Sequence, residues 1–134
     1  MHAADDIRGW LIDLDGTLVC GGRAMPGASA FLDACSGRFV VVSNDAEHTP
    51  AELARGLLRM GLEVPAGRIV LAGAVALDDI AMRRPGARVL MLASPSLMRH
   101  AGRRGLTPVQ TQPDVVFLGR DLGHGQAGTL VGPQ

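Results

Sequence analysis

Four short apolar runs alternate along the chain with segments whose hydrophobic residues recur every three or four positions. The runs cover residues 10–14, interrupted only by Asp13, and residues 39–42, 89–92 and 115–118. The first run is bounded by turn residues and is typical of a strand buried on both faces of a parallel sheet. The alternation of strands with helical segments predicts an α/β fold, in which parallel strands are joined by right-handed connections.

The segments between the runs carry helix signals. Pro26 suits the first turn of a helix that Gly37 ends. A second helix begins after Thr49, because residues 49–52 read Thr-Pro-Ala-Glu, a capping box with proline at the first helical position. Two later helices are expected, over residues 74–82 and from residue 94 to about residue 101. The expected buried faces of the first two helices are Ala28, Phe31, Leu32 and Cys35, and Leu53, Leu57, Leu58 and Met60.

Two carboxylates, Asp13 and Asp15, stand at the end of the first predicted strand. Open α/β sheets keep their ligand crevice at the carboxyl ends of the strands. Residues two apart at a strand end can point the same way while Leu14 between them stays in the core. Two close carboxylates repel unless a cation lies between them or one of them holds a proton, and Mg²⁺ is a natural cation for oxygen ligands. Gly16 allows a tight turn whose N–H groups face an anion, and Thr17 adds a hydroxyl that can hold this turn.

An Asp-Gly pair is also a common turn signal, so Asp15-Gly16 alone could be a simple turn. A simple turn leaves Asp13 unexplained, because a carboxylate inside an apolar run is desolvated without compensation. The pattern therefore favours a functional site. The segment 19–25 that follows is Gly-rich and is expected to be a mobile loop over this site.

The run Asp13-Leu14-Asp15-Gly16-Thr17-Leu18 resembles the first motif of the haloacid dehalogenase superfamily, Asp-x-Asp-Gly-Thr. The resemblance implies that Asp13 is the nucleophile that takes a phosphoryl group. It implies that Asp15 protonates the leaving oxygen and later activates water, and that Mg²⁺ is held by Asp13 and the Asp15 carbonyl. General chemistry agrees, since a carboxylate nucleophile divides a difficult displacement into two steps and a second carboxyl can relay the proton. Dehalogenase members lack the second Asp, so Asp15 indicates phosphoryl transfer.

A second strand-end motif strengthens the resemblance. Residues 39–42 lead into Ser43-Asn44-Asp45, which is similar to the second motif of the superfamily, a strand ending in Ser or Thr that Asn often follows. Ser43 would then hydrogen-bond the transferring phosphoryl group, and Asn44 would line the pocket or hold the loop. Polar residues after a strand are also ordinary loop residues. Two such motifs separated by one helical segment are more specific than either alone, and with Gly16 and Thr17 they define the expected substrate-binding residues.

The downstream elements resemble the α/β cap that follows the second motif in the para-nitrophenylphosphatase-like branch (class IIA) of the superfamily. The resemblance rests on the helix near Gly73 and on residues 85–89 and 113–116. It implies a cap that covers the pocket and selects the substrate. We therefore expect three segments: a Rossmann-like parallel-sheet core segment over residues 1–70, part of the cap over 71–118 and a flexible, Gly-rich tail over 119–134.

The chain departs from the superfamily pattern in its cations and its later acids. The third motif is a Lys, sometimes an Arg, that neutralises the nucleophile and the phosphoryl group, and the fourth is an acidic cluster that completes the Mg²⁺ site. The chain contains no Lys, since all 13 of its Lys and Arg residues are Arg. After Leu118 its one acid is Asp121, and we interpret Asp121 and Arg120 as loop residues. Mg²⁺ would then be held weakly, and losing one electrostatic element of this kind lowers the rate about a hundredfold or more.

Composition and charge exclude other classes. With 134 residues, of which 47% are hydrophobic and 19% charged, the chain is globular rather than disordered. Aromatic residues make up 3% and the formal net charge is +0, so we expect neither a nucleic-acid partner nor an anionic membrane surface. No run approaches transmembrane length, residues 1–6 do not resemble a secretory signal, and Cys20 and Cys35 lack metal-type spacing. A reducing, cytoplasmic location is expected.

Three functional hypotheses remain. The first is Mg²⁺-dependent hydrolysis of a small phosphomonoester, by a chain that carries the front half of such a phosphatase. The second is a non-catalytic module that binds phosphate or Mg²⁺, or forms a homo-oligomer through an open sheet edge. The third is a receiver-like domain that is phosphorylated on Asp13 without turnover, which the order of the motifs argues against.

Overall fold

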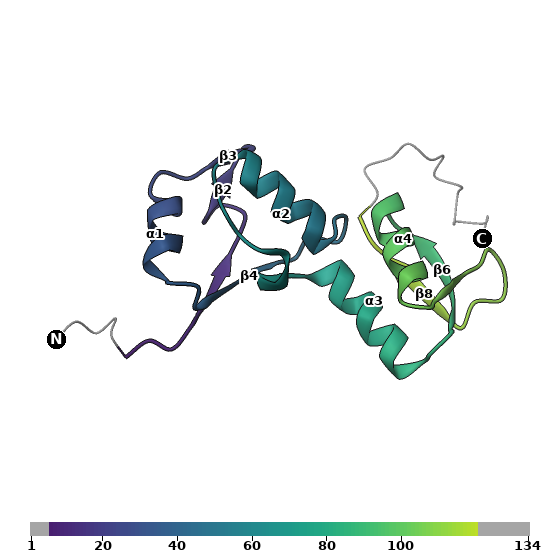
Figure 1. Cartoon of the computed structure of the whole chain (residues 1–134). Helices are drawn as coiled ribbons and strands as arrows, with labels where there is room; N and C mark the ends of the chain where they lie inside the picture. The colour runs from purple at the N-terminus through teal and green to yellow at the C-terminus, as the bar shows by residue number, and fades with distance from the viewer. Residues whose placement is uncertain (1–5, 121–134) are drawn as a thin grey trace, which may run out of the picture.

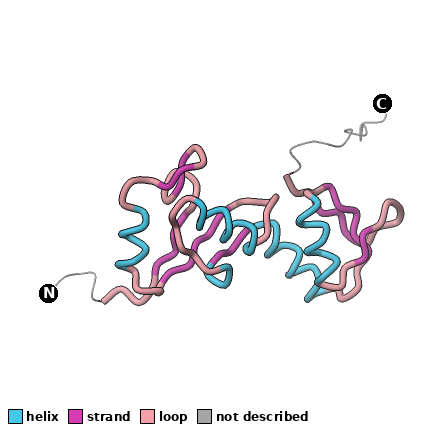
Figure 2. Tube along the Cα trace, turned by 45° about the horizontal axis from the view of Figure 1, so that its top comes forward, coloured by secondary structure: helices cyan, strands magenta, loops and turns pink. Residues whose placement is uncertain are grey.

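The structure is a computed structural model that describes residues 6–120 of the chain. It has two lobes connected through helix α3 (Ala72–Arg83) (Figure 1). The tube in Figure 2 shows the strands of the two lobes as separate groups with α3 between them. Each lobe contains a three-stranded parallel sheet with helices packed against it. The α/β fold with parallel strands that the sequence predicts is therefore confirmed.

The first lobe is built on a sheet with the strand order β1-β4-β5. These strands are β1 (Trp10–Asp13), β4 (Phe39–Ser43) and β5 (Ile69–Leu71). In the parallel register Asp13 lies opposite Val42, while Ser43 lies opposite Leu71. The carboxyl ends of all three strands therefore meet at one edge of the sheet.

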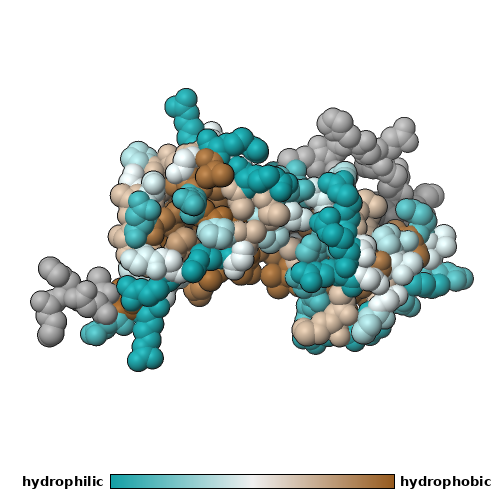
Figure 3. All heavy atoms as spheres, in the orientation of Figure 1, coloured by the Kyte–Doolittle hydropathy of each residue, from teal (hydrophilic) through white to brown (hydrophobic). Residues whose placement is uncertain are grey.

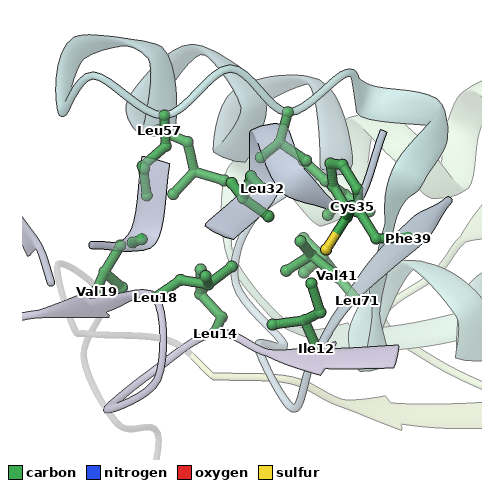
Figure 4. Close-up of a cluster of buried hydrophobic side chains, with 14 of the residues drawn as sticks. Ile12, Leu14, Leu18, Val19, Leu32, Cys35, Phe39, Val41, Leu57 and Leu71 are labelled. Carbon is green, nitrogen blue, oxygen red and sulfur yellow. The ribbon is translucent and has the colours of Figure 1, made fainter. Parts of the chain in front are cut away.

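One face of this sheet is buried beneath α1 (Ala28–Ala34) and α2 (Pro50–Arg59). Burial alternates along the strands, because successive side chains point to opposite faces of a sheet. Figure 4 shows the side chains that meet in this cluster. The strands contribute Ile12, Phe39, Val41, Ile69 and Leu71, and the helices contribute Ala28, Leu32 and Leu57.

The opposite face of the sheet is open to solvent. Leu11 is 80% exposed and Val70 is 41% exposed. The expectation that the first strand is buried on both faces is therefore wrong for Leu11, since residues 6–120 supply a covering layer for one face only. Figure 3 shows hydrophobic side chains, in brown, reaching the surface of the first lobe.

The segment 19–25, which was expected to be a mobile loop over the site, contains a short hairpin. Strand β2 (Val19–Cys20) pairs in antiparallel fashion with β3 (Arg23–Ala24). Gly21 and Gly22 form the turn between them, with φ angles of 58° and 76°. Two consecutive positive φ angles are typical of tight hairpin turns and favour glycine, so the Gly-Gly pair was itself the signal.

The helices of the first lobe differ from expectation in detail. α2 begins with the predicted capping box, in which the Thr49 hydroxyl accepts from the N–H of Glu52 and the Glu52 carboxylate accepts from the N–H of Thr49. Leu57 on α2 is fully buried, but its neighbour Leu58 is 62% exposed, because adjacent helix residues point about 100° apart. Pro26 precedes α1 rather than occupying its first turn.

The second lobe repeats the same plan. Its strand order is β7-β6-β8, comprising β6 (Arg88–Leu92), β7 (Thr107–Pro108) and β8 (Val115–Leu118), and α4 (Pro95–Arg103) packs with α3 on one face. The buried residues are Leu77, Ala87, Val89, Met91, Ala93, Leu97, Ala101, Leu106 and Phe117. The other face is again exposed, with Val116 at 53% and Leu118 at 71%. The sequence predicted β6, α4 and β8.

The lobes contact each other through the loop between β4 and α2. Gly73, at the start of α3, packs so closely on Ala46 of this loop that a Cβ at Gly73 would lie 2.8 Å from the Ala46 Cα. From the second lobe, the Ser94 hydroxyl donates to a backbone carbonyl of the same loop. The Ser96 hydroxyl donates to Glu52 Oε1 of α2 at 2.6 Å. The second lobe therefore braces the loop that follows β4.

Buried hydrophobic residues form a separate cluster in each lobe. The first cluster reaches Ala74 and the second begins at Leu77, so the division falls within α3. The boundary expected at residue 70 stays a prediction, a few residues before this division. Most of the Gly-rich tail expected over residues 119–134 lies outside the described residues, beyond Arg120.

The structure also bears on the membrane and cysteine expectations. Within residues 6–120, no helix combines the length and the apolar character needed to cross a membrane. The cysteines are both free, with Cys20 exposed on the hairpin and Cys35 buried in the first cluster.

Candidate active site

Asp13 and Asp15 line the same recess at the carboxyl ends of the first lobe's strands. The recess has a volume of about 510 Å³, within the size range of small-molecule sites. Leu14, between the two acids, is 3% exposed and packs in the core. The other lining residues are Val42, Ser43, Asn44, Val70, Ala72 and Val75. The structure therefore brings four of the six predicted site residues, two from each motif, to one surface.

The other two predicted residues, Gly16 and Thr17, form the turn after β1. Gly16 has a φ of 78°, a conformation that strains residues with a Cβ, and its N–H donates to the Val19 carbonyl at 2.7 Å. The Thr17 hydroxyl lies 3.5 Å from Asp13 Oδ2, at the outer limit of a hydrogen bond. These two residues shape the backbone and support the carboxylate, but they do not line the 510 Å³ recess.

Ser43 ends β4 beside Asp13, with its hydroxyl already accepting one hydrogen bond. The Asp45 N–H donates to Ser43 Oγ at 3.1 Å. A hydroxyl offers one proton and two lone pairs, so this contact uses a lone pair and leaves the proton for another acceptor. The Ser43 hydroxyl can therefore donate to an anion in the recess.

Asp45 organises the loop after β4, a role that the sequence reasoning missed. Its carboxylate accepts from the N–H groups of Glu47 at 2.7 Å and His48 at 2.8 Å, and it contacts His48 Nδ1 at 2.7 Å. Burial opposes ionisation of Asp45, but these hydrogen bonds and the imidazole together lower its pKa below the ordinary value of 3.8. The signal in the sequence was an Asp directly after a strand, since Asp side chains commonly bind backbone N–H groups two or three residues ahead.

The pKa of His48 shifts in the opposite direction to that of Asp45. Burial disfavours its charged form, but the hydrogen bond and charge of Asp45, with Glu47 and Glu52 nearby, raise the pKa of His48 above the ordinary value of 6.5. His48 does not line either recess at the strand ends. The pair therefore holds the loop and takes no visible part in the chemistry.

A second, smaller recess adjoins the first. Its volume is about 210 Å³, and it shares Asp15 and Asn44 with the larger recess. The remaining lining residues are Asp45, Ala46, Glu47 and Arg120. Arg120 was expected to be a plain loop residue. Its position beside the strand-end site depends on the packing of the second lobe on the first, which no local sequence signal reveals.

The oxygen donors at the end of β1 suit Mg²⁺ in kind. Mg²⁺ is commonly bound through one or two carboxylates together with waters and substrate phosphate. In the described part of the chain, no three His, Cys, Asp or Glu side chains gather as metal ligands. The oxygen atoms of Asp13 and Asp15 at this recess are therefore ligands of the kind that Mg²⁺ takes.

Comparison with known proteins places the sequence in a family. A model of haloacid dehalogenase-like hydrolases matches residues 10–107. D-glycerol 3-phosphate phosphatase of Mycobacterium tuberculosis is 33% identical over 119 residues, which cover 86% of this chain and 34% of the relative. Acid sugar phosphatase of Staphylococcus saprophyticus is 30% identical over 118 residues, which cover 85% of this chain and 46% of the relative.

Solved structures give the same result. The magnesium complex of glycerol phosphate phosphatase from Mycobacterium tuberculosis is 31% identical, with a TM-score of 0.82 over 92% of this chain and 39% of that chain. A 4-nitrophenylphosphatase from Thermotoga maritima is 26% identical, with a TM-score of 0.83 over 94% of this chain and 49% of that chain. This similarity confirms the expected para-nitrophenylphosphatase-like branch. The chain spans between about a third and half of the length of these relatives. With the family model covering most of its length, the chain belongs to the haloacid dehalogenase-like hydrolase family.

Proposed function

We propose that this chain carries the nucleophile-bearing part of a phosphatase site that hydrolyses a small phosphomonoester. The observation that carries the proposal is the single recess lined by Asp13, Asp15 and Ser43. The names of two relatives, a D-glycerol 3-phosphate phosphatase and an acid sugar phosphatase, support a small phosphorylated polyol or sugar as the substrate.

The proposed reaction has two steps. The Asp13 carboxylate attacks phosphorus, the bond from phosphorus to the leaving oxygen breaks, and Asp15 gives its proton to that oxygen. Asp15 then takes a proton from water, whose oxygen attacks the aspartyl-phosphate, so that phosphate leaves and the Asp13 carboxylate is restored. The Ser43 hydroxyl donates to a phosphoryl oxygen in both steps.

The neighbouring residues support these steps. Gly16 permits the tight turn after β1, in which the N–H groups of residues 16–18 donate to the Leu14 and Val19 carbonyls rather than to the recess, against the expectation that they face an anion. Thr17 lies beside the Asp13 carboxylate, and Asn44 lines the recess. Mg²⁺, when bound by Asp13 and the Asp15 carbonyl, would neutralise charge on the phosphoryl oxygens.

A non-catalytic binding or association module is the second candidate. It is favoured by the absence of Lys from the sequence and, among the described residues, by the absence of a group of three acidic, His or Cys side chains that could hold a metal ion. The open face that includes Leu11, and the position of β1 at the edge of the described sheet, would suit association with a second copy.

The test is Mg²⁺-dependent hydrolysis of para-nitrophenyl phosphate by the 134-residue chain, compared with Asp13→Asn. Removing a nucleophile that acts as one unit with its partners is expected to lower turnover on the order of a thousandfold or more. Asp33→Asn is the matched control, because Asp33 is an exposed acid on α1 and its loss changes the net charge equally.

Turnover that survives in Asp13→Asn would contradict the proposed nucleophile. A folded chain without turnover that still binds inorganic phosphate would support the binding module. Stable retention of one phosphoryl group on Asp13 would instead support the receiver-like hypothesis.

A further inference from the structure

The feature that the proposed chemistry leaves unused is Arg120, at the 210 Å³ recess. This recess contains Asp15 but not Asp13, whereas the larger recess contains both. If Asp15 protonates the leaving oxygen, the smaller recess lies on the side of the site where the leaving group departs. Arg120 is therefore placed beside the organic part of a substrate rather than behind the nucleophile.

The backbone brings Arg120 to this position through a specific contact between the lobes. The N–H of Gly119 donates to the Leu92 carbonyl at 2.8 Å, which continues the β8 pairing, and the N–H of Arg120 donates to the Ala46 carbonyl at 2.9 Å. A Cβ at residue 119 would lie 2.9 Å from that same Ala46 oxygen. Glycine at 119 thus permits the close approach that carries Arg120 to the loop after Asn44.

The charges around Arg120 leave its donors available. Among the residues that line the two recesses, Arg120 is the only cationic one in the described part of the chain. Within residues 6–120, no carboxylate lies within 4.0 Å of its guanidinium nitrogens. A guanidinium offers five N–H donors in a planar fork, so Arg120 can bind oxygen atoms of a ligand in the smaller recess.

The surrounding acids restrict the kind of ligand. Asp15, Asp45 and Glu47 line the recess with Arg120, so carboxylates outnumber the cation and an anionic leaving group would be repelled. A neutral hydroxyl can accept from Arg120 and donate to a carboxylate or to the Asn44 side-chain oxygen at the same time. The mixture of donors and acceptors therefore suits uncharged, hydroxyl-bearing groups.

We propose that Arg120 is a specificity-determining residue, which binds hydroxyl oxygens of an uncharged leaving group on the Asp15 side of the site. This proposal rests on the phosphatase function proposed above. It assigns to the second lobe a direct contact with substrate, and to Gly119 the role of permitting that contact.

The test measures binding of two non-hydrolysable ligands by calorimetry in the presence of Mg²⁺. The first is 3,4-dihydroxybutylphosphonate, which carries the hydroxyls of a polyol, and the second is methylphosphonate, which has none. Arg120→Gln is expected to weaken binding of the dihydroxy ligand about tenfold, the effect of losing one charge-assisted hydrogen bond. Its affinity for methylphosphonate should stay within about twofold.

Arg103→Gln is the matched control, since Arg103 is exposed at the end of α4 in the same lobe and its loss changes the charge equally. This control should leave both affinities unchanged. Equal weakening of both ligands by Arg120→Gln would place Arg120 on the phosphoryl group and overturn the assignment, and no weakening of either would overturn it outright. If the folded wild-type chain binds neither ligand, the proposed function fails and this inference fails with it.

Discussion

The two lobes share an architecture, but only the first ends its strands in reactive groups. Each lobe has three parallel strands with helices over one face and exposed apolar residues on the other. In the first lobe, β1 ends at Asp13 and β4 at Ser43, beside the larger recess. In the second lobe, β6 ends at Leu92 and β8 at Leu118. Two sheets of the same architecture therefore differ in the side chains at their strand ends, and the candidate site lies where these side chains are polar.

Several polar groups of the second lobe hold structure. His100 Nε2 and Arg104 Nε each lie 2.8 Å from Asp78 Oδ1, which ties α4 and its end to α3. Ser94 and Ser96 reach across to the first lobe. The second lobe thus contributes to the site by bracing the loop that carries Asn44, and four predictions test how far the lobes depend on each other.

The largest effect is expected from truncating one fully buried leucine in each lobe, Leu57→Ala in α2 and Leu97→Ala in α4. Each should lower the free energy of unfolding by about 2–5 kcal/mol, because a cavity replaces packed atoms. Urea unfolding can be followed by fluorescence of Trp10, the one tryptophan, in the first lobe, and by circular dichroism for the whole chain. Leu97→Ala should shift both signals, because Leu97 packs at the junction beside Gly73.

Leu11→Ala is the control, since an 80% exposed side chain should change stability by less than about 0.5 kcal/mol. If Leu97→Ala leaves the urea midpoint of the Trp10 fluorescence transition unchanged, the lobes unfold independently.

Gly73→Ala should break the junction itself. The added Cβ would lie 2.8 Å from the Ala46 Cα and 2.9 Å from Leu97 Cδ1, and the backbone atom cannot swing aside. Overpacking of this kind is expected to cost about 1–3 kcal/mol. Gly56→Ala in α2 is the counterpart, because its nearest neighbour is a flexible Arg59 nitrogen at 3.9 Å, and it should stabilise by about 0.5–1 kcal/mol. In thermal denaturation, a melting temperature of Gly73→Ala equal to or above that of wild type would contradict the tight junction.

The two helix caps give a smaller, graded comparison. Thr49→Ala removes a cap that acts within the first lobe and should cost about 0.5–2 kcal/mol. Ser94→Ala removes the cap of α4 and also the hydrogen bond to the Glu47 carbonyl of the other lobe. The lost hydrogen bond should lower the free energy of unfolding by about 0.5–1.5 kcal/mol beyond the loss of the cap. Ser29→Ala, on the exposed side of α1, should have little effect. Equal losses for the two caps, measured by urea unfolding, would mean that the contact between lobes adds no stability.

The parts of the fold that the sequence predicts are those with strong local signals. The capping box at Thr49 and the apolar run 39–42 depend on neighbouring residues, and the structure agrees with both. β5 has three residues and β7 has two, too few to show a period-two pattern. The exposure of Leu11 depends on which layers cover the sheet, and an apolar run alone cannot reveal a missing layer.

The candidate site also contains residues that the sequence predicts and one that it does not. Asp13, Asp15 and Ser43 meet because parallel neighbouring strands bring their carboxyl ends together, so their grouping follows from the predicted parallel sheet. Arg120 reaches the smaller recess through packing between lobes. Contacts of that kind join residues far apart in the sequence and leave no pattern along the chain.

The smallest effect is expected from His48→Gln, which removes the titrating partner of Asp45 in the first lobe. The pKa of His48 is raised, so its contribution to stability is complete below pH 6.5 and is lost as the pH rises through the folded-state pKa. The pKa of Asp45 is lowered, so its contribution is complete above pH 3.8 and is lost at more acidic pH. The pair therefore stabilises the loop most between about pH 4 and 6.5. His48 is 46% exposed, and solvent screening limits the effect to about 0.2–1 kcal/mol.

The measurement is urea unfolding of wild type and His48→Gln at pH 5.5 and pH 8.5. The difference between the two proteins should be larger at pH 5.5, where both partners are charged, and should shrink at pH 8.5. Arg83→Gln provides the comparison from the second lobe, because the Arg83–Asp79 pair at 2.9 Å contains no histidine and should give the same difference at both pH values. A His48→Gln effect that is equal at both pH values would show that the imidazole holds the loop by its shape and neutral hydrogen bond alone, without its charge.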